Sequence, residues 1–510
     1  MRTNPPGSLR TLPEASVVDA RNGYRIESAF LPFTDDEGRD CEVYAERCLP
    51  VEGSHPGILH CPGGGQTVDR ADLLDWARKG FAAVGFDWQI GTYPAHDPRR
   101  KSRWPEEVVH QNHYITSPSE AILPLAVRAA GVCIDWLTQA ENVDAERIGV
   151  VGISWGGYLA WLVGAYEPRV KAVVPVYGCG GQFDPRYPGE GIRLPAKVAE
   201  VWRRRWDPFR IAQLHCKPVA YLSCSSDFFG ILPLADELLN RLRVPRRRSW
   251  LPNADHCLGP GESALGLAWL CHYLKDGPSL PAEPLLTEAL EVEADAAGEV
   301  DHVETWWTPP YRDGNLGCWI RGRPGPEASL AYGRVHYKRG FCLSTPLRYL
   351  DPGPGPSLPA RYPDLRDGLG WSWAMGSTQF HGNDVTMEGL GEGRVRLRRD
   401  RAHEDDEPAF HINTFAHPGW NNGRGEAFLL ELHAESEEPL TEAEVILLLR
   451  GTGGTEEVAA RLPLIDHRLR IERAAFSAFP PMMTLRSIVR VTVRLRGRAR
   501  SFRIGPLQRD

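Results

Sequence analysis

Three residues with the spacing Gly-x-Ser-x-Gly, namely Gly152, Ser154 and Gly156, have the pattern of a nucleophilic serine site. The apolar run RIGVVGI at 147–153 predicts a buried strand before the serine, and SWGGYLAWLVGAYE at 154–167 predicts a helix directly after it. A serine on such a sharp strand-to-helix turn is typical of a nucleophile elbow, where glycines avoid steric clashes. An ordinary turn can have the same composition. Partners for the serine elsewhere in the chain are therefore needed to distinguish a nucleophile from a turn residue.

An acid and a base follow later in the chain, in the order that such a site requires. A serine hydroxyl is a weak nucleophile at neutral pH and needs a general base. Asp227 comes just after the predicted strand KPVAYLSC, and His256 lies in the loop between the next predicted strand and helix. We predict that His256 takes the proton of Ser154 and that Asp227 orients the imidazole. Asp255 is an alternative acid, although adjacent side chains rarely pair with the required geometry.

The oxyanion that forms during acyl transfer needs N–H donors close to the serine. The amide of Trp155, directly after the serine, is the first predicted donor. The second is predicted in HCPGGGQT, from Gly63 or Gly64, because Pro62 carries no N–H. A plain glycine-rich turn is the alternative, and a phosphate-binding loop is disfavoured because no Gly-Lys-Ser/Thr follows.

Alternating strands and helices surround these residues. Apolar runs such as GILHC at 57–61 and FAAVGFDW at 81–88 predict buried strands, and DRADLLDWARKG at 69–80 has helical spacing. Because both faces of such strands are covered, the pattern predicts an α/β fold with a mostly parallel, doubly wound sheet. Further strands are predicted at 24–33, 41–50, 147–153, 170–178, 217–224 and 247–252, and further helices at 118–140, 154–167, 195–206, 234–242 and 262–274.

Proline-rich stretches divide the chain into three predicted domains. The catalytic domain is expected over 1–276, with a cap insertion near 179–216. A small β module is expected at 285–355, and an all-β sandwich domain, with a jelly roll as one option, at 365–510. These C-terminal regions contain short extended runs and few helical periods.

The composition is that of an ordinary globular protein and argues against several function classes. The 510 residues are 42% hydrophobic and 25% charged, with a formal net charge of -7. A nucleic-acid-binding protein would show a strongly basic face, and a membrane span needs about 20 apolar residues in a row. We expect no nucleic-acid partner and no membrane partner. The start of the chain lacks the apolar region of a secretory signal, which predicts a cytoplasmic location, although a chain trimmed of an export signal would look the same.

The cysteine and histidine patterns predict neither a disulfide framework nor a metal site. The 11 cysteines form an odd set without a Cys-x-x-Cys pair, and Cys133 and Cys271 lie in apolar helical patterns typical of buried free thiols. His110 and His113 form a His-x-x-His pattern without a third ligand nearby and are interpreted as structural. We expect no metal and no organic cofactor, because acyl transfer through a serine requires neither.

Four stretches resemble bacterial acetyl xylan esterases and dienelactone hydrolases of the α/β-hydrolase superfamily. The most specific is GISWGGYLAWLVGAYEPRVKAVVPVYGCG at 152–180. WRRRWDPF at 202–209 resembles a W-x-x-x-W-D-P element, SSDFFGILP at 225–233 the acid-bearing segment, and LPNADHCLG at 251–259 the histidine loop. The resemblance covers roughly 25–276 and implies an α/β-hydrolase fold.

For the site, the resemblance implies a triad of Ser154, Asp227 and His256 without a cofactor. Family members usually carry a His-Gly-Gly-Gly loop, and in this chain Cys61 and Pro62 occupy its first two positions. The departure leaves the serine chemistry intact and alters the loop that forms the oxyanion hole.

Together these patterns predict a carboxylic ester hydrolase for short acyl groups such as acetyl, with a small molecule or a carbohydrate as the alcohol. An acyl-enzyme forms on Ser154 and is hydrolysed by water that His256 activates. One alternative is a serine peptidase of the prolyl-oligopeptidase-like type, disfavoured because the N-terminal stretch is too short for a propeller. Another is a non-catalytic glycan-binding protein with a decayed hydrolase domain. The sequence is also compatible with a homo-oligomer.

Tryptophans in the cap and the β region each have two interpretations. Trp202 and Trp206 would shape an acyl pocket or contact a sugar, or else be buried beneath an amphipathic cap helix. Four tryptophans of the β region would stack on sugar rings but are more typical of a sandwich core. They are Trp306, Trp307, Trp371 and Trp373.

Overall fold

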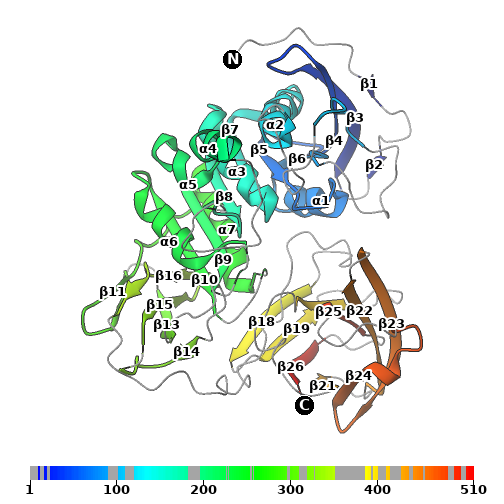
Figure 1. Ribbon diagram of the computed structural model, residues 1–510, viewed down its shortest axis with the longest axis vertical. Helices are drawn as coiled ribbons and strands as arrows, with labels where there is room; N and C mark the ends of the chain where they lie inside the picture. The colour runs from blue at the N-terminus through cyan, green and yellow to red at the C-terminus, as the bar shows by residue number, and fades with distance from the viewer. Residues whose placement is uncertain are drawn as a thin grey trace. The chain divides into compact units, whose positions relative to one another are not determined.

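The computed structural model describes most of the chain (Figure 1). Asp255, His110, His113, Trp371, Trp373 and residues 182–195 of the predicted cap lie outside the described residues. The described residues are 10–11, 17–19, 23–89, 101–108, 120–181, 196–225, 227, 229–252, 256, 258–295, 299–308, 319–326, 328–350, 385–391, 394–399, 409–413, 427–435, 440–451, 454–480, 488–495 and 501–509.

The chain forms two compact units whose boundary passes through secondary-structure elements. Strands β9 (Val219–Cys224) and β10 (Arg246–Leu251) and helix α7 (Pro260–Leu274) each contribute residues to both units. The ends of both strands and the loops that follow them belong to the second unit. The first unit comprises residues 1–222, 229–248 and 265–283, and the second comprises 223–228, 249–264 and 284–510. The division into three domains stays a prediction.

A ten-stranded mixed sheet is built in the order β1-β3-β4-β6-β5-β7-β8-β9-β10, with β2 beside β3. Strands β6, β5, β7, β8 and β9 pair in parallel, as the apolar runs predict. The hairpin of β3 and β4 adds an antiparallel edge, which makes the sheet mixed. The remaining strands are β1 (Arg10–Thr11), β2 (Val17–Asp19), β3 (Tyr24–Thr34), β4 (Asp40–Pro50), β5 (His55–Cys61), β6 (Ala82–Phe86), β7 (Val143–Ile153) and β8 (Val170–Val176).

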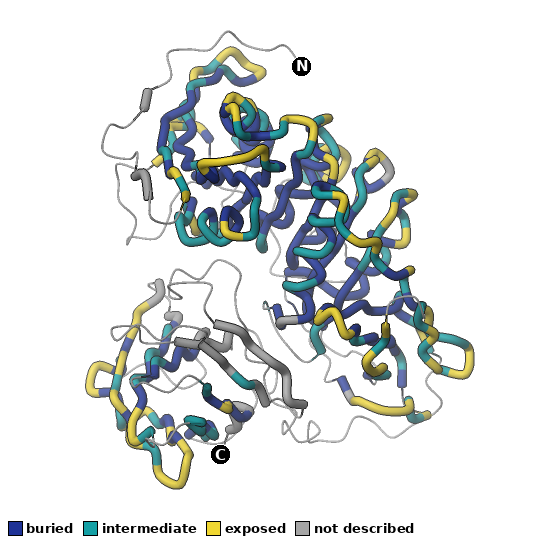
Figure 2. The backbone as a smooth tube through the Cα atoms, turned by 180° about the vertical axis from the view of Figure 1, so that it is seen from behind, coloured by how far each residue is buried: buried dark blue, intermediate teal, exposed yellow. Residues whose placement is uncertain are grey.

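Burial explains why these runs form parallel strands. Every residue of β6 and β9 is buried, which is expected when both faces of a strand are covered (Figure 2). Helix α3 (Trp155–Tyr166) packs on β7 and β8 and buries residues on all its sides, as a central helix does. The other helices are α1 (Arg70–Arg78), α2 (Ile122–Thr138), α4 (Ala196–Arg205), α5 (Pro208–Ile211) and α6 (Leu232–Arg241).

The strand order reverses at β5. The chain continues from β5 to β6 on one side, whereas β7 lies on the other side. In open α/β sheets such a reversal opens a crevice at the carboxyl ends of the strands, where ligands bind. The register pairs Cys61, the last residue of β5, with Gly152, two residues before Ser154. The glycine-rich loop and Ser154 therefore leave neighbouring strands at the same edge.

An antiparallel sheet of five strands forms the first part of the β region in the second unit. Strand β13 (Val300–Thr308) lies between β14 (Ile320–Arg321) and β15 (Leu330–Tyr337), and β15 also pairs β16 (Cys342–Ser344) and β17 (Arg348–Tyr349). Trp306 and Trp307 on β13 are buried, which favours their interpretation as core residues over sugar contacts. A short hairpin of β11 (Leu285–Leu286) and β12 (Val292–Glu293) precedes this sheet.

A nine-stranded antiparallel sheet follows, in the order β18-β19-β26-β21-β24-β23-β22-β25-β20. Alternate residues of β22 are buried, such as Val445 and Leu447, and they share one hydrophobic core with Phe428 of β21. The strands are β18 (Val385–Gly391), β19 (Arg394–Arg399), β20 (Ala409–Asn413), β21 (Ala427–Ala434), β22 (Glu442–Gly451), β23 (Gly454–Ile465), β24 (Arg468–Glu472), β25 (Ile488–Leu495) and β26 (Ser501–Arg509).

Two further features of the described part of the chain bear on the sequence predictions. No disulfide joins the cysteines within it, and Cys133 is buried as a free thiol while Cys271 is half-buried. None of its helices combines the length and the apolar character that crossing a membrane requires.

Candidate active site

Ser154 lies on the sharp turn between β7 and α3. Its backbone has φ 57° and ψ -120°, a conformation that non-glycine residues rarely adopt and that is typical of a strained functional turn. The Ser154 N–H donates to the Val176 carbonyl over 2.9 Å, and the Tyr158 N–H donates to the Ser154 carbonyl over 3.0 Å. The neighbouring strand and the first turn of the helix thus hold the serine in this conformation.

The glycines of the motif are required by close backbone approach. A Cβ atom on Gly152 would lie 1.9 Å from the Gly156 carbonyl oxygen. A Cβ atom on Gly156 would lie 2.0 Å from the Cys61 carbonyl oxygen, at the end of β5. No side chain fits at such distances, so the two glycines let α3 begin directly against the end of β5. This confirms the steric reason that the sequence gives for the motif.

The glycine-rich loop after β5 lies beside the serine turn. A Cβ atom on Gly63 would be 3.4 Å from the Cβ of Ser154, and one on Gly64 would be 2.7 Å from Cδ1 of Trp155. The structure therefore places both glycines that were predicted as oxyanion donors next to the start of α3.

Two glutamines that the sequence analysis missed hold this loop. The Gly63 N–H donates to Oε1 of Gln66 over 3.0 Å, and buried Gln89 accepts from the Gly65 N–H and donates to the Gly63 carbonyl. Gln66 lies within the loop itself, whereas Gln89 is 24 residues away and carries no motif that links it to the loop, so the sequence offers no signal for its role. The N–H of Gly63 is therefore engaged in this structure.

Asp227 and His256 form a close pair in the second unit. The Nδ1 atom of His256 lies 2.9 Å from Oδ2 of Asp227, which is a hydrogen-bond distance. The aspartate side chain is fully buried, whereas a fifth of the histidine side chain is exposed. The Ser225 N–H donates to the Leu251 carbonyl over 2.8 Å, which joins the chain after β9 to the end of β10.

The pair has the features of an oriented base. A buried carboxylate on Nδ1 fixes the tautomer that leaves Nε2 for proton transfer. The Cys224 thiol also donates to Asp227 Oδ2 over 3.5 Å, a contact the sequence analysis did not predict. The pairing of Asp227 with His256 was predicted from chain order. The approach of His256 to Ser154 stays a prediction.

A buried ionic network supports the segment after His256. Glu262, fully buried at the start of α7, accepts from the Ser249 hydroxyl over 2.9 Å and from the Gly259 N–H over 3.2 Å. Arg334 of β15 completes the network with a 2.7 Å ion pair to Glu262. Because Arg334 lies 72 residues away in the chain, no local pattern could have linked it to the histidine segment.

Aromatic residues line the elbow helix within the first unit. The Trp202 indole N–H donates to the Tyr158 hydroxyl over 3.0 Å, and Trp202 is buried. The rings of Trp155 and Phe229 lie 4.8 Å apart. Trp202 therefore packs against α3 as the buried residue of a cap helix, which is the simpler of its two interpretations.

Asp207 explains the W-D-P element of the sequence. Its Oδ1 atom accepts from the Phe209 N–H over 3.0 Å, capping α5, and from the Gly181 N–H over 2.9 Å. Complete burial raises the pKa of this carboxyl to about 6, although the two N–H donors act in the opposite direction. The aspartate thus ties the segment after β8 to the cap helices.

One segment of the chain matches a known protein family. Residues 31–185 match the profile of the family described as acetyl xylan esterase (AXE1). This match supports an acetyl xylan esterase-like α/β-hydrolase fold, and the central sheet to which the segment contributes is mixed. The matched segment contains β5, β7, the glycine-rich loop and Ser154, and ends before the acid and the histidine.

Individual relatives are similar over parts of the chain. Dipeptidyl-peptidase 5 from Porphyromonas gingivalis is 23% identical over 219 residues, which are 40% of this chain and 28% of that protein. The chain thus spans less than a third of the length of that relative. Acetyl xylan esterase from Paenibacillus sp. R4 is 19% identical with a TM-score of 0.40, covering 53% of this chain and 90% of that one. Acetyl xylan esterase 1 from Thermoanaerobacterium sp. JW/SL YS485 is 17% identical with a TM-score of 0.42, covering 52% and 88%.

Proposed function

We propose that the protein is a serine carboxylic ester hydrolase that works through an acyl-enzyme. Ser154 is the nucleophile, His256 the general base and Asp227 the group that orients the imidazole. The observation that carries the proposal is the strained Ser154 elbow beside a glycine-rich loop, in a chain that also holds a 2.9 Å Asp227–His256 pair. These are the parts that serine hydrolysis requires.

The reaction proceeds in two balanced steps. The Ser154 hydroxyl oxygen attacks the ester carbonyl carbon while its proton passes to Nε2 of His256. The tetrahedral intermediate then expels the alcohol, which takes that proton, and the acyl group stays on the serine. Water gives a proton to His256 and attacks the acyl-enzyme, and the carboxylic acid leaves as Ser154 regains its proton.

The oxyanion is held by backbone N–H groups near the start of α3. The Trp155 N–H is one donor, because it directly follows the nucleophile at a helix N-terminus. Gly64 is preferred to Gly63 as the second donor, since the Gly63 N–H already donates to Gln66. Cys61 and Pro62, which occupy the first two positions of the usual His-Gly-Gly-Gly loop, donate no N–H to the oxyanion in our proposal.

The substrates are short acyl esters, acetyl esters above all, with carbohydrate alcohols as one class. The match of residues 31–185 to the acetyl xylan esterase family supports this choice. We also propose that the enzyme acts in the cytoplasm on a soluble ester. The C-terminal strands are proposed to form a β-sandwich, with alternating burial along β22 as support.

Hydrolysis of p-nitrophenyl acetate tests the proposal. Ser154→Ala removes the nucleophile and should reduce kcat by at least about 1,000-fold, with an unchanged circular dichroism spectrum. Ser54→Ala, which alters an exposed serine in the loop between β4 and β5, is the matched control and should retain full activity. Equal turnover by the Ser154→Ala enzyme and the control would contradict the proposal.

Labelling with a fluorophosphonate separates an enzyme from a binding protein. Stoichiometric labelling of the folded chain at Ser154 supports an activated serine, and labelling that is absent supports the glycan-binding alternative. A peptide library screened beside esters addresses the peptidase alternative, which the partial similarity to dipeptidyl-peptidase 5 keeps open. Faster turnover of peptides than of acetyl esters would favour the peptidase.

A further inference from the structure

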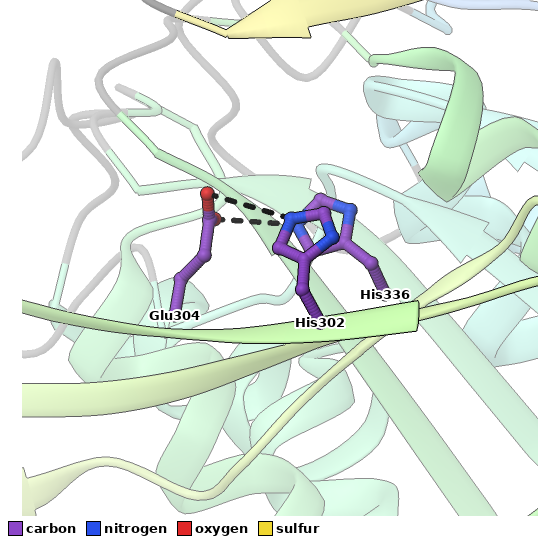
Figure 3. Close-up of side chains that lie close together, drawn as sticks. All are labelled: His302, Glu304 and His336. Atoms are coloured by element: carbon purple, nitrogen blue, oxygen red, sulfur yellow. Dashed lines mark hydrogen bonds and ion pairs between the residues drawn. The ribbon is translucent and has the colours of Figure 1, made fainter. Parts of the chain in front are cut away.

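Two histidines and a glutamate face one another on the five-stranded sheet of the second unit. His302 and Glu304 are two residues apart on β13 and project from the same face. His336 on β15 is directly opposite His302 in the register. Figure 3 shows the two imidazoles side by side with their nitrogens turned toward the Glu304 carboxylate.

The donor atoms lie at distances close to those of a coordination sphere. One ligand atom from each side chain lies within 4.8 Å of the other two. Nε2 of His336 is 3.2 Å from Oε2 of Glu304, and Nε2 of His302 is 3.9 Å from Oε1. Ligands about 2 Å from a tetrahedral zinc ion are about 3.3 Å apart, so the first pair fits and the second must close slightly.

Each histidine has a second partner on its other ring nitrogen. Nδ1 of His302 lies 2.8 Å from Oδ2 of Asp301, and Nδ1 of His336 lies 3.2 Å from Sγ of Cys342. A bulge in the ladder at Asp301 gives that residue the irregular position from which it reaches its neighbour. In metal sites, contacts of this kind on the second ring nitrogen orient the histidine ligands. Here they direct both Nε2 atoms toward Glu304.

Two arginines lie near Glu304, and their positive charges would oppose the binding of a cation. Arg334 is 4.0 Å from Glu304, but it forms its closer 2.7 Å ion pair with Glu262. Arg321 is 3.4 Å from Glu304 and half-exposed, so water screens its charge. Asp301 lies against His302, and with Glu262 and Glu304 the nearby carboxylates outnumber these two guanidinium groups by one, which leaves a negative balance of charge near the histidines.

We propose that His302, Glu304 and His336 bind a zinc ion, with water in the fourth position. Imidazole nitrogens and a carboxylate are ligands that zinc accepts, whereas magnesium and calcium prefer sites made of oxygen alone. The rings of the two histidines are stacked at 4.0 Å and 13°, so one ring must turn for both lone pairs to converge. The half-exposed His302 side chain supplies that freedom and gives the ion access from solvent.

The sequence analysis missed this site because its ligands do not follow a metal-binding motif. A His-x-Glu on one strand and a single histidine 32 residues after the glutamate resemble ordinary strand residues. Their convergence follows from the antiparallel register of β13 and β15.

Zinc titration of the full chain, without a histidine tag and after treatment with a chelator, tests the site. A chromogenic chelator that competes for zinc reports the affinity, and cobalt substitution reports the ligand geometry through its visible spectrum. We expect the unaltered chain to bind one equivalent of zinc. His302→Ala and Glu304→Gln should each weaken the affinity for this equivalent by about 100-fold, and Asp301→Asn should weaken it by about tenfold. His433→Ala, in the other stacked pair with His467, is the matched control and should leave this equivalent unchanged.

The outcome is decided independently of the proposed esterase activity, because the assay measures only metal binding. His302 is half-exposed, so its replacement leaves the fold intact, and circular dichroism verifies this. Loss of the equivalent in the His302→Ala and Glu304→Gln variants but not in the His433→Ala control supports the site. The proposal is overturned if the unaltered chain binds no zinc in competition with the chelator, or if the variants bind it as tightly as the control.

Discussion

The Glu262 network provides a quantitative test of how the five-stranded sheet of the second unit supports the segment after His256. Glu262→Gln preserves the shape of the side chain and removes its charge. Arg334, which is also buried, then keeps Glu304 at 4.0 Å as the nearest described carboxylate. The variant thus isolates the buried ion pair that joins β15 to the start of α7.

The expected loss of stability follows from burial. Removing one partner of a buried pair costs about 3–5 kcal/mol, because the other charge stays desolvated. The glutamine oxygen still accepts one or two of the hydrogen bonds that Glu262 accepts, at about 0.5–1.5 kcal/mol each, which offsets part of this cost. We expect a net loss of about 3 kcal/mol in the free energy of unfolding of the second unit.

Calorimetry measures this effect. At about 2–4 °C per kcal/mol for a unit of 150–250 residues, the transition of the second unit should fall by about 6–12 °C. Glu431→Gln is the matched control, because Glu431 is paired with Arg468 at an exposed site of the same unit. An exposed pair contributes about 0–1 kcal/mol, so the control should shift little.

The kinetics of ester hydrolysis provide a second measurement of the Glu262 network. If the network positions the segment after His256, Glu262→Gln lowers kcat for p-nitrophenyl acetate more than it changes KM. In a double-mutant cycle, Arg334→Met combined with Glu262→Gln should cost less than the sum of the two single changes. A transition temperature for Glu262→Gln equal to that of the Glu431→Gln control would refute the reasoning.

Two further predictions concern the first unit. Gly156→Ala forces a Cβ atom to within 2.0 Å of the Cys61 carbonyl and should destabilise the protein by about 3 kcal/mol or abolish soluble expression, as chemical denaturation shows. Asp207→Asn should stabilise the protein at pH 7, because the carboxyl pKa is raised to about 6 by burial and the amide oxygen still accepts both N–H bonds. Between about pH 4 and pH 6 the wild type loses free energy of unfolding as pH rises, because the folded protein holds the Asp207 proton more tightly than the unfolded chain does. The stability advantage of the variant therefore grows over this range to about 3 kcal/mol. Equal dependence of stability on pH in the two proteins would contradict a raised pKa for Asp207.

Local patterns in the sequence were sufficient to predict the strand, turn and helix around Ser154. The apolar run before Ser154 and the glycines around it predicted a strand, a turn and a helix, which the structure contains. Chain order also paired Asp227 with His256, because both follow neighbouring strands of one sheet. These features depend on residues that are adjacent in the chain or on a known order of strands.

Features that depend on distant residues were not predicted. The Glu262–Arg334 pair and the His302–His336 contact arise from pairing between elements, and neither has a local signal. Gln89 acts through its side chain on a loop that another strand positions. Charged and amide side chains of this kind are common on protein surfaces, so only the folded structure distinguishes those that are buried.

The boundary between the two units has a practical consequence for how this chain can be divided. A fragment that ends at the proline-rich linker near residue 276 would retain His256 yet lose Arg334, Ser344 and Cys342. Ser344 accepts a hydrogen bond from the Trp250 N–H, Cys342 packs against Gly261, and Arg334 forms an ion pair with Glu262. In the fragment, the end of β10 and the start of α7 would lose all three contacts. Truncated or domain-swapped versions of the chain should therefore keep the five-stranded sheet, which ends with β17 at Tyr349.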